Sequence, residues 1–175
     1  MAKPDRFLSR RLGRSVGLAA LVSALLFACA NGSAAGGGQL GSRPEFRLKT
    51  TDGRVIGPRD FPGKVVVVDF WATWCAPCHL QARIMAPVVA ALQGQSVQFL
   101  AADVGEPEDI VRSFLRMSPY PYPVLLDSDN KVSDDFGINA LPTLMVIDRA
   151  GRITSLRAGL MDGDTLKRLI RQASL

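Results

Sequence analysis

The segment from Val65 to Cys78 constrains this chain more than any other. It begins with an apolar run, Val65 to Phe70, that is rich in β-branched residues and holds a single charge, Asp69. This composition is typical of a strand buried on both faces of a sheet. After Cys78 the apolar residues recur at helical spacing. The segment therefore predicts a strand, a tight turn and a helix, with Cys75 and Cys78 at the helix N-terminus.

The two cysteines are separated only by Ala76 and Pro77. A helix N-terminus presents unpaired N–H groups and a positive partial charge, and both stabilise a thiolate, the reactive form of cysteine. Pro77 suits the first helical turn because its missing N–H costs little there. We expect Cys75 at the exposed end of the helix and Cys78 one turn in, more buried and close enough for a disulfide. A C-x-x-C beside a strand–helix unit indicates a redox site.

Strand and helix patterns alternate along the rest of the chain after a small hairpin with Asp52-Gly53 as its turn. Residues 58–63 and 118–123 are expected to be loops, the second a stiff connector. This order predicts an α/β fold with a mixed central β-sheet flanked by helices and an N-terminal β-hairpin extension. The expected strands are 46–48, 55–56, 65–71, 97–103, 124–126, 143–147 and 153–158, and the expected helices are 78–92, 107–117, 131–136 and a last one from the Asp162 cap to about Ser174.

The first 29 residues have the composition of an export signal. Residues 1–15 are basic, and the apolar stretch that follows has about 15 residues, fewer than the ~20 of a spanning helix. These 29 residues carry a net charge of +4, out of a formal net charge of +5 for the whole chain. The rest of the chain is therefore nearly neutral, and its sequence predicts no basic patch that would bind nucleic acid. Cys29 follows Leu26-Phe-Ala as in lipoprotein signals, and we expect it to be acylated. Ordinary cleavage at Ala28-Cys-Ala30, or retention of the helix as an anchor, stays open.

Composition then divides the chain into three parts: a signal peptide or membrane anchor over 1–29, a tether over 30–42 and a folded domain over 43–175. Residues 30–42 are mostly Gly, Ser and Ala, which cannot form a core and are typical of a flexible linker. This organisation predicts a domain tethered to the outer side of a membrane, on the periplasmic side of a bacterial envelope. Disulfides persist in such a compartment.

The folded part resembles thioredoxin-fold proteins, and among them the TlpA/ResA-like group of membrane-tethered thiol-disulfide oxidoreductases. The active-site stretch 71–78 is similar to that of the family, and Leu141-Pro142-Thr143 is similar to its cis-proline loop. Further segments of resemblance are 60–64, 104–106, 122–127 and 136–143 with 148–151. Together they span about residues 43–175.

The resemblance implies roles that the chemistry also supports. Cys75 would attack a substrate disulfide and Cys78 would resolve the mixed disulfide. Asp69 matches the family's buried acid, with a raised pKa suited to proton exchange with Cys78. Pro142 would lie near the cysteine pair and leave the Leu141 backbone free to bond an extended substrate. The expected rim of the site consists of Trp74, Ala76, Pro77 and His79, with Trp71 assigned equally to the rim or to the core.

Two positions depart from the pattern of this group. Gln81, which cannot titrate, stands where several relatives carry Glu, and His79 stands where Lys or Arg is usual. We expect His79 to be an exposed helix residue with a minor electrostatic effect on the thiolate. Both departures leave the redox direction open.

Parts of the sequence are also compatible with other functions. Cys75-Ala-Pro-Cys78-His79 also satisfies the attachment signature of c-type haem, which would make the protein a coloured electron carrier. A zinc site would have only three candidate ligands. A peroxide-reducing enzyme would not need a vicinal dithiol, and a non-catalytic binder of unfolded exported proteins would keep its function without Cys75.

The sequence therefore favours a disulfide reductase that acts on exported proteins, one candidate client being apocytochrome c during cytochrome c biogenesis. Electrons would come from a membrane donor protein, and the N-terminal anchor would contact the membrane. No cofactor, metal or nucleic acid is implied, and a monomer is expected.

Overall fold

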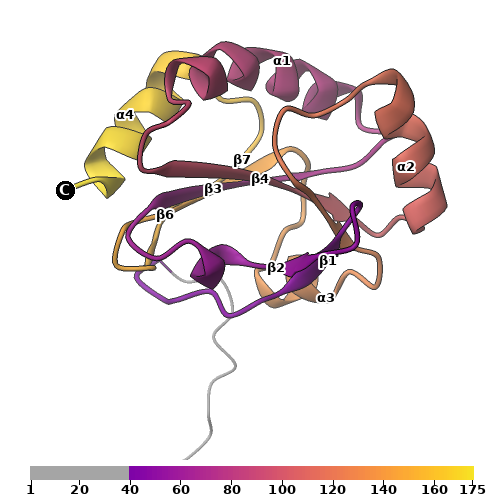
Figure 1. Cartoon of the computed structure of the whole chain (residues 1–175), viewed down its shortest axis with the longest axis horizontal. Coiled ribbons are helices and arrows are strands. Elements are labelled where there is room, and N and C mark those ends of the chain that lie inside the picture. The colour runs from indigo at the N-terminus through magenta and orange to yellow at the C-terminus, as the bar shows by residue number, and fades with distance from the viewer. Residues whose placement is uncertain (1–39) are drawn as a thin grey trace, which may run out of the picture. The chain divides into compact units, whose positions relative to one another are not determined.

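The structure, a computed structural model, describes residues 40–175, so the expected leader and most of the expected tether lie outside the described residues. The described part contains one seven-stranded mixed sheet in the order β2-β1-β5-β4-β3-β6-β7 (Figure 1). Its strands are β1 (Leu48–Thr50), β2 (Val55–Ile56), β3 (Val65–Trp71), β4 (Val97–Val104), β5 (Val124–Asp127), β6 (Thr143–Ile147) and β7 (Ile153–Ala158), and its helices are α1 (Ala76–Ala91), α2 (Glu108–Met117), α3 (Lys131–Asp135) and α4 (Gly163–Ala173), with a 3-10 turn at Pro58–Asp60.

The central strand β3 is buried along its whole length, as its valine-rich composition predicts. It pairs in parallel with β4 and antiparallel with β6. The register sets Trp71 beside Asp103 of β4 and Phe70 beside Thr143 of β6. The ends of these three strands therefore bring together the segments that surround the two cysteines.

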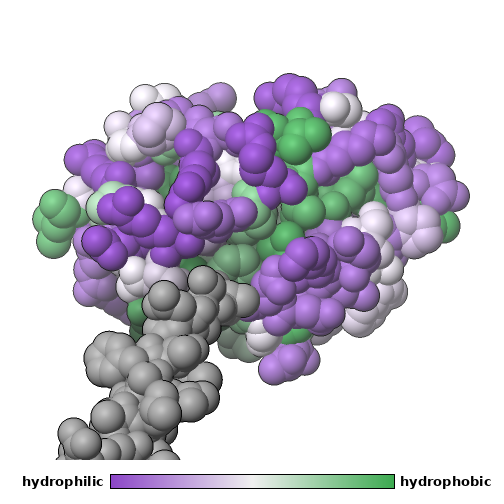
Figure 2. Space-filling model, turned by 90° about the horizontal axis from the view of Figure 1, so that it is seen from below, coloured by the Kyte–Doolittle hydropathy of each residue, from purple (hydrophilic) through white to green (hydrophobic). Residues whose placement is uncertain are grey.

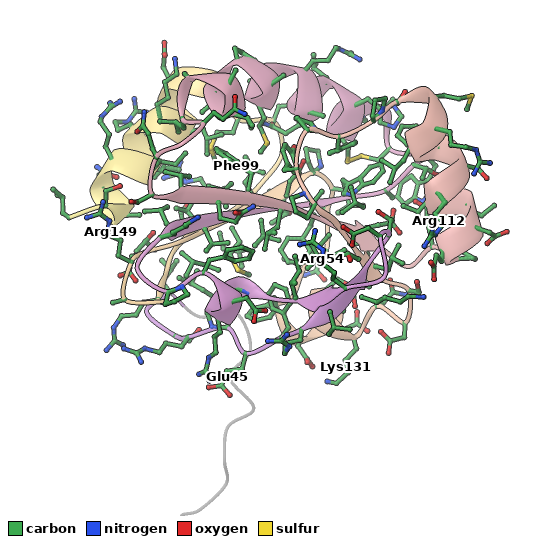
Figure 3. The ribbon with its side chains drawn as sticks, in the orientation of Figure 1. Glu45, Arg54, Phe99, Arg112, Lys131 and Arg149 are labelled. Atoms are coloured by element: carbon green, nitrogen blue, oxygen red, sulfur yellow. A yellow bond between two sulfur atoms is a disulfide. The ribbon has the colours of Figure 1, made fainter. Side chains whose placement is uncertain are left out.

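The alternation of side chains along β3 divides the core into two clusters. Val67 and Trp71 belong to the cluster that includes apolar residues of α1, α2 and α4, which lie on one side of the sheet in Figure 1. Phe99 of β4 points into the same space between the sheet and α1 (Figure 3). Val68 and Phe70 belong to the other cluster, with apolar residues of the hairpin and α3. The cysteines lie in the first cluster, so the redox pair is built into the α1 side of the sheet.

Charged residues lie mainly at the periphery, where labelled side chains such as Arg112 and Lys131 point outward (Figure 3). The face of the molecule seen from below is accordingly largely hydrophilic, around a central hydrophobic area (Figure 2). Arg112 and Lys131 make i,i+4 ion pairs with Glu108 and Asp135, respectively. Exposed pairs of this kind contribute little to stability, so the fold depends on the two apolar clusters.

The predicted fold class is confirmed, including the mixed sheet and the N-terminal hairpin. Element boundaries shift by one or two residues, and the loop expected over 58–63 contains a short 3-10 turn. Gly41 and Ser42, expected in the tether, exchange backbone hydrogen bonds with Ile153 of β7 and so are attached to the domain. Within residues 40–175, no helix combines the length and apolarity that crossing a membrane requires.

Candidate active site

The two cysteines form a disulfide at the N-terminus of α1, where the sequence pattern predicted them. Their Cα atoms are 5.3 Å apart. Cys75 is the N-cap residue, and the Cys78 N–H donates to its Sγ at 3.2 Å. Pro77 lies in the first turn, where no helical hydrogen bond is lost. In the reduced protein the same N–H would stabilise a Cys75 thiolate.

The exposure of this site differs from the expectation. Cys75 is only 4% exposed and Cys78 is fully buried, whereas Cys75 was expected at an exposed helix end. Capping turns the Cys75 side chain back over the first turn of α1 and into the apolar cluster. Ala76 and Pro77 are exposed, and Trp74 is 71% exposed. The disulfide therefore lies beneath a rim, and Trp74 is the large side chain that projects from it.

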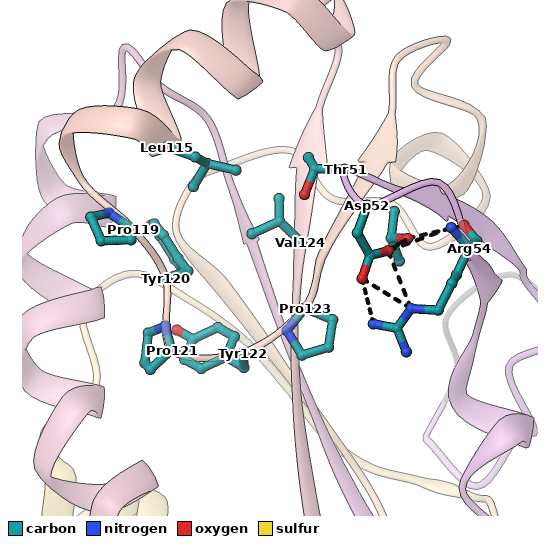
Figure 4. Close-up of a pocket in the computed structure, with 11 residues that line it drawn as sticks. Thr51, Asp52, Arg54, Leu115, Pro119, Tyr120, Pro121, Tyr122, Pro123 and Val124 are labelled. Atoms are coloured by element: carbon teal, nitrogen blue, oxygen red, sulfur yellow. Dashed lines mark hydrogen bonds and ion pairs between the residues drawn. The ribbon is translucent and has the colours of Figure 1, made fainter.

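Trp71 belongs to the core and not to the rim. It is fully buried, and its ring centroid lies 4.6 Å from that of Tyr120 and 5.4 Å from that of Phe114. Tyr120 and the buried Tyr122 come from the Pro-rich segment 118–123, which connects α2 to β5 (Figure 4). The segment is a connector, as predicted, and its tyrosines also line the core beside the site, which the sequence did not indicate.

Asp69 is buried as the resemblance implied. It is 0% exposed, and neither carboxylate oxygen has a hydrogen-bond partner among the described residues. Burial disfavours the charged form and raises the pKa of Asp69 well above its ordinary value. Alternation along β3 sets Asp69 on the same face as Trp71, the face that α1 covers. A neutral carboxyl group beneath α1 can exchange a proton with a buried group nearby.

A second acidic group near the site was not predicted. Glu106 is 8% exposed, and its carboxylate accepts the Thr73 N–H at 2.5 Å and the Thr73 hydroxyl at 2.6 Å. Thr73 lies in the turn between β3 and Cys75, so Glu106 fixes this turn from the loop after β4. Asp103, also buried, precedes Glu106 by three residues. Segment 104–106 resembles the family, but nothing in its sequence indicates that Glu106 binds Thr73, 33 residues away.

The Leu141–Pro142 peptide bond is cis, as the resemblance implied. Pro142 directly precedes Thr143, which pairs with Phe70 near the end of β3, so this loop lies at the same end of the sheet as the cysteine turn. The Pro142 carbonyl accepts from the Gly159 N–H. The Leu141 N–H and carbonyl have no hydrogen-bond partner among the described residues. A free backbone edge of this kind can bind an extended chain.

The two departures from the family pattern have structural consequences. Gln81 is fully buried; its amide donates to the Met161 carbonyl at 3.1 Å and accepts the Met161 N–H at 2.7 Å, which joins α1 to the segment before α4. His79 was expected to be exposed but is half-buried. Its ring stacks on that of Phe114, with the ring centroids 5.0 Å apart, and its Nε2 atom is buried away from solvent. His79 and Phe114 also line a hollow of about 390 Å³ beside Arg83. His79 therefore packs between α1 and α2.

Comparison with known proteins decides the family. The sequence profile of the AhpC/TSA family matches residues 42–156. The chain belongs to this family. It is similar to the thiol-disulfide oxidoreductases ResA of Geobacillus thermodenitrificans, 33% identical over 71% of each chain, and Bacillus subtilis, 35% identical over 67% of this chain and 66% of the relative. A crystal structure described as a DsbE-type thiol:disulfide interchange protein of Chlorobium tepidum matches with a TM-score of 0.72 and 28% identity, over 79% of this chain and 99% of that one.

The protein is therefore a thiol-disulfide oxidoreductase of the ResA/DsbE type with a thioredoxin-like fold. The c-type haem alternative receives no support from these relatives. Within residues 40–175, no group of three or more His, Cys, Asp or Glu is arranged to hold a metal ion.

Proposed function

We propose that this protein is a membrane-tethered, extracytoplasmic reductase of disulfides in exported proteins. The observation that carries the proposal is the Cys75–Cys78 pair at the N-terminus of α1, in a chain similar to thiol-disulfide oxidoreductases. The basic and apolar composition of residues 1–29 supports export, and Cys29 supports a lipid anchor. The domain then acts on the periplasmic side of the envelope, where disulfides form and persist.

The reaction moves two electrons from the protein to its substrate. The Cys75 thiolate attacks one sulfur of the substrate disulfide; that bond breaks, a mixed disulfide forms, and the other substrate sulfur leaves as a thiolate. The ionised form of Asp69 accepts the Cys78 proton, and the resulting Cys78 thiolate attacks Sγ of Cys75, which releases the second substrate sulfur and closes the internal disulfide. The substrate thiolates take up protons. A membrane donor protein then returns two electrons to the Cys75–Cys78 disulfide.

The rim of the site gives the substrate its position. An extended segment of the client pairs with the free Leu141 backbone, beside Pro142. The exposed Trp74 ring covers the apolar part of that segment. Because Cys75 is almost fully buried, the substrate disulfide has to approach closely, and this requirement favours flexible or unfolded clients.

One client class is the oxidised C-x-x-C-H site of an apocytochrome c, which must be reduced before haem is attached. The experiment mixes the reduced full-length protein with an oxidised C-x-x-C-H peptide and follows peptide thiols by alkylation and mass spectrometry. A peptide of the same composition with the histidine moved away from the cysteines is the matched control. We expect both to be reduced, the C-x-x-C-H peptide about tenfold faster, corresponding to about 1.4 kcal/mol in the barrier.

Equal rates for the two peptides would support a general disulfide reductase and contradict a preference for apocytochrome c as the client. If instead the reduced protein left both peptides oxidised, and its oxidised form converted the reduced peptides to disulfides, the reductase proposal itself would be wrong.

A further inference from the structure

Gln81 pairs with both backbone groups of a residue in a distant segment of the chain. It lies in α1, three residues after Cys78, and is fully buried. Its amide N–H donates to the Met161 carbonyl at 3.1 Å, and its side-chain carbonyl accepts the Met161 N–H at 2.7 Å. Met161 is also buried and lies between β7 and α4, outside the sheet and the helices. One side chain therefore satisfies a donor and an acceptor that have no regular partner there.

The segment that Gln81 holds is also attached to the cis-proline loop. The Gly159 N–H, two residues before Met161, donates to the Pro142 carbonyl at 2.8 Å. Gly159 has a φ of +88°, which glycine adopts readily, so the chain can turn here from the end of β7 toward α1. The three residues 159–161 thus connect Gln81 to the Leu141–Pro142 backbone through hydrogen bonds at both ends of the segment.

This connection joins the two halves of the active site, which belong to different elements. The cysteine pair is carried by the start of α1, whereas the free Leu141 backbone lies before β6. Helices α1 and α4 lie on the same side of the sheet (Figure 1), and a Cβ atom at Gly163 would lie 3.2 Å from Cγ2 of Val88. Apolar packing of this kind has no fixed direction, whereas a pair of hydrogen bonds sets both distance and orientation. Gln81 therefore fixes the spacing that helix packing alone leaves adjustable.

We propose that Gln81 is a positioning residue: it holds the Leu141 backbone at the distance from Cys75 that an extended client requires. The inference rests on the proposed function, in which the client pairs with this backbone. An extended peptide has to bring its disulfide to Cys75 while it bonds to Leu141, so its reduction depends on the spacing. A small disulfide without a peptide backbone needs only Cys75. Gln81 acts through Met161 and Gly159 and makes no bond to the substrate.

The test compares two substrates of the reduced full-length protein in single turnovers, an oxidised C-x-x-C-H peptide and bis(2-hydroxyethyl) disulfide. Gln81→Met introduces an unbranched, flexible side chain that fills the space but cannot pair with Met161. We expect the peptide rate to fall about tenfold relative to the rate with the small disulfide. The fall should come from a higher half-saturating peptide concentration and not from a lower maximal rate. Gln95→Met, the same change at an exposed position beyond the C-terminal end of α1, should keep the wild-type ratio.

Gln81→Glu provides a second arm, which also serves if Gln81→Met does not fold. A protonated glutamic acid can donate to the Met161 carbonyl and accept the Met161 N–H, whereas the carboxylate can only accept. Burial favours the protonated acid at pH 5. The ratio of the two rates in Gln81→Glu should therefore match the wild-type ratio at pH 5 and fall below it at pH 8. Dividing by the small-disulfide rate removes the pH dependence of the Cys75 thiolate, which both substrates share.

A wild-type ratio in Gln81→Met, or a ratio in Gln81→Glu that follows the wild type at both pH values, would overturn the proposal. The failure of the proposed function has a different signature. A wild-type protein that leaves the peptide oxidised would contradict the reductase itself, and with it the inference that rests on it.

Discussion

Cys75→Ser abolishes disulfide exchange, and Cys78→Ser stops it after the first step. Only Cys75 attacks the substrate in the proposed mechanism, and a serine hydroxyl cannot supply the thiolate that the helix N-terminus stabilises. We expect the rate of reduction of a protein disulfide to fall by at least about a thousandfold in Cys75→Ser. In Cys78→Ser, Cys75 still attacks, but nothing resolves the product, and a stable mixed disulfide accumulates.

The measurement is a non-reducing gel with mass spectrometry of the adduct. The two variants control for each other, because each removes one sulfur from the same pair and leaves the helix N-terminus in place. Mixed disulfides that form on Cys78 in the Cys75→Ser variant would reverse the assigned roles. Full function of both serine variants would instead favour the non-catalytic binder.

Asp69→Asn is expected to change both the stability and the rate. Burial raises the pKa of Asp69 in the folded protein above its unfolded value. The group therefore contributes stability that is fully present below about pH 4, and this contribution is lost as the pH rises through the folded-state pKa. Asparagine does not titrate, so the variant escapes this loss. At pH 9 we expect it to be more stable than the wild type by about 2 kcal/mol or more, since asparagine avoids both the burial of a charge and the cost of holding a proton on Asp69 at alkaline pH.

The free energy of unfolding is measured by urea denaturation of the oxidised protein at several pH values between 4 and 9. Asp109→Asn, at an exposed position, is the matched control and should follow the wild type.

The same Asp69→Asn protein should exchange disulfides about a hundredfold more slowly at pH 7, because Cys78 has lost its proton acceptor. If the variant were stabilised but fully active, Asp69 would take no part in the reaction, and its role as the proton acceptor of Cys78 would be wrong.

The features that the sequence predicted are those that local patterns determine. The β-branched run from Val65 to Phe70 forms a fully buried strand, and the apolar spacing after Cys78 forms α1. These elements follow from side-chain alternation and helical periodicity within a few residues. The position of the cysteines at the helix N-terminus followed from the same strand–turn–helix pattern. The cis Leu141–Pro142 bond followed from the resemblance of residues 141–143 to the cis-proline loop of the family.

The features that the sequence did not predict depend on contacts between distant segments. The hydrogen bonds from Thr73 to Glu106 exist because β3 and β4 pair in parallel with Trp71 beside Asp103. The stacking of His79 on Phe114 likewise requires the packing of α1 against α2. A helical spacing shows which face of α1 is apolar, but not which aromatic ring it meets. Exposure of His79 was wrongly predicted for this reason.

The reduction potential of the Cys75–Cys78 pair tests most directly whether this protein is a reductase. The full-length protein is equilibrated in dithiothreitol or glutathione buffers of known ratio, and the reduced fraction is measured by thiol alkylation with peptide mapping, which separates this pair from Cys29. The account predicts a potential near that of thioredoxin, about −270 mV. A value near about −120 mV, as in strong periplasmic oxidants, would contradict it and make the protein a donor of disulfides.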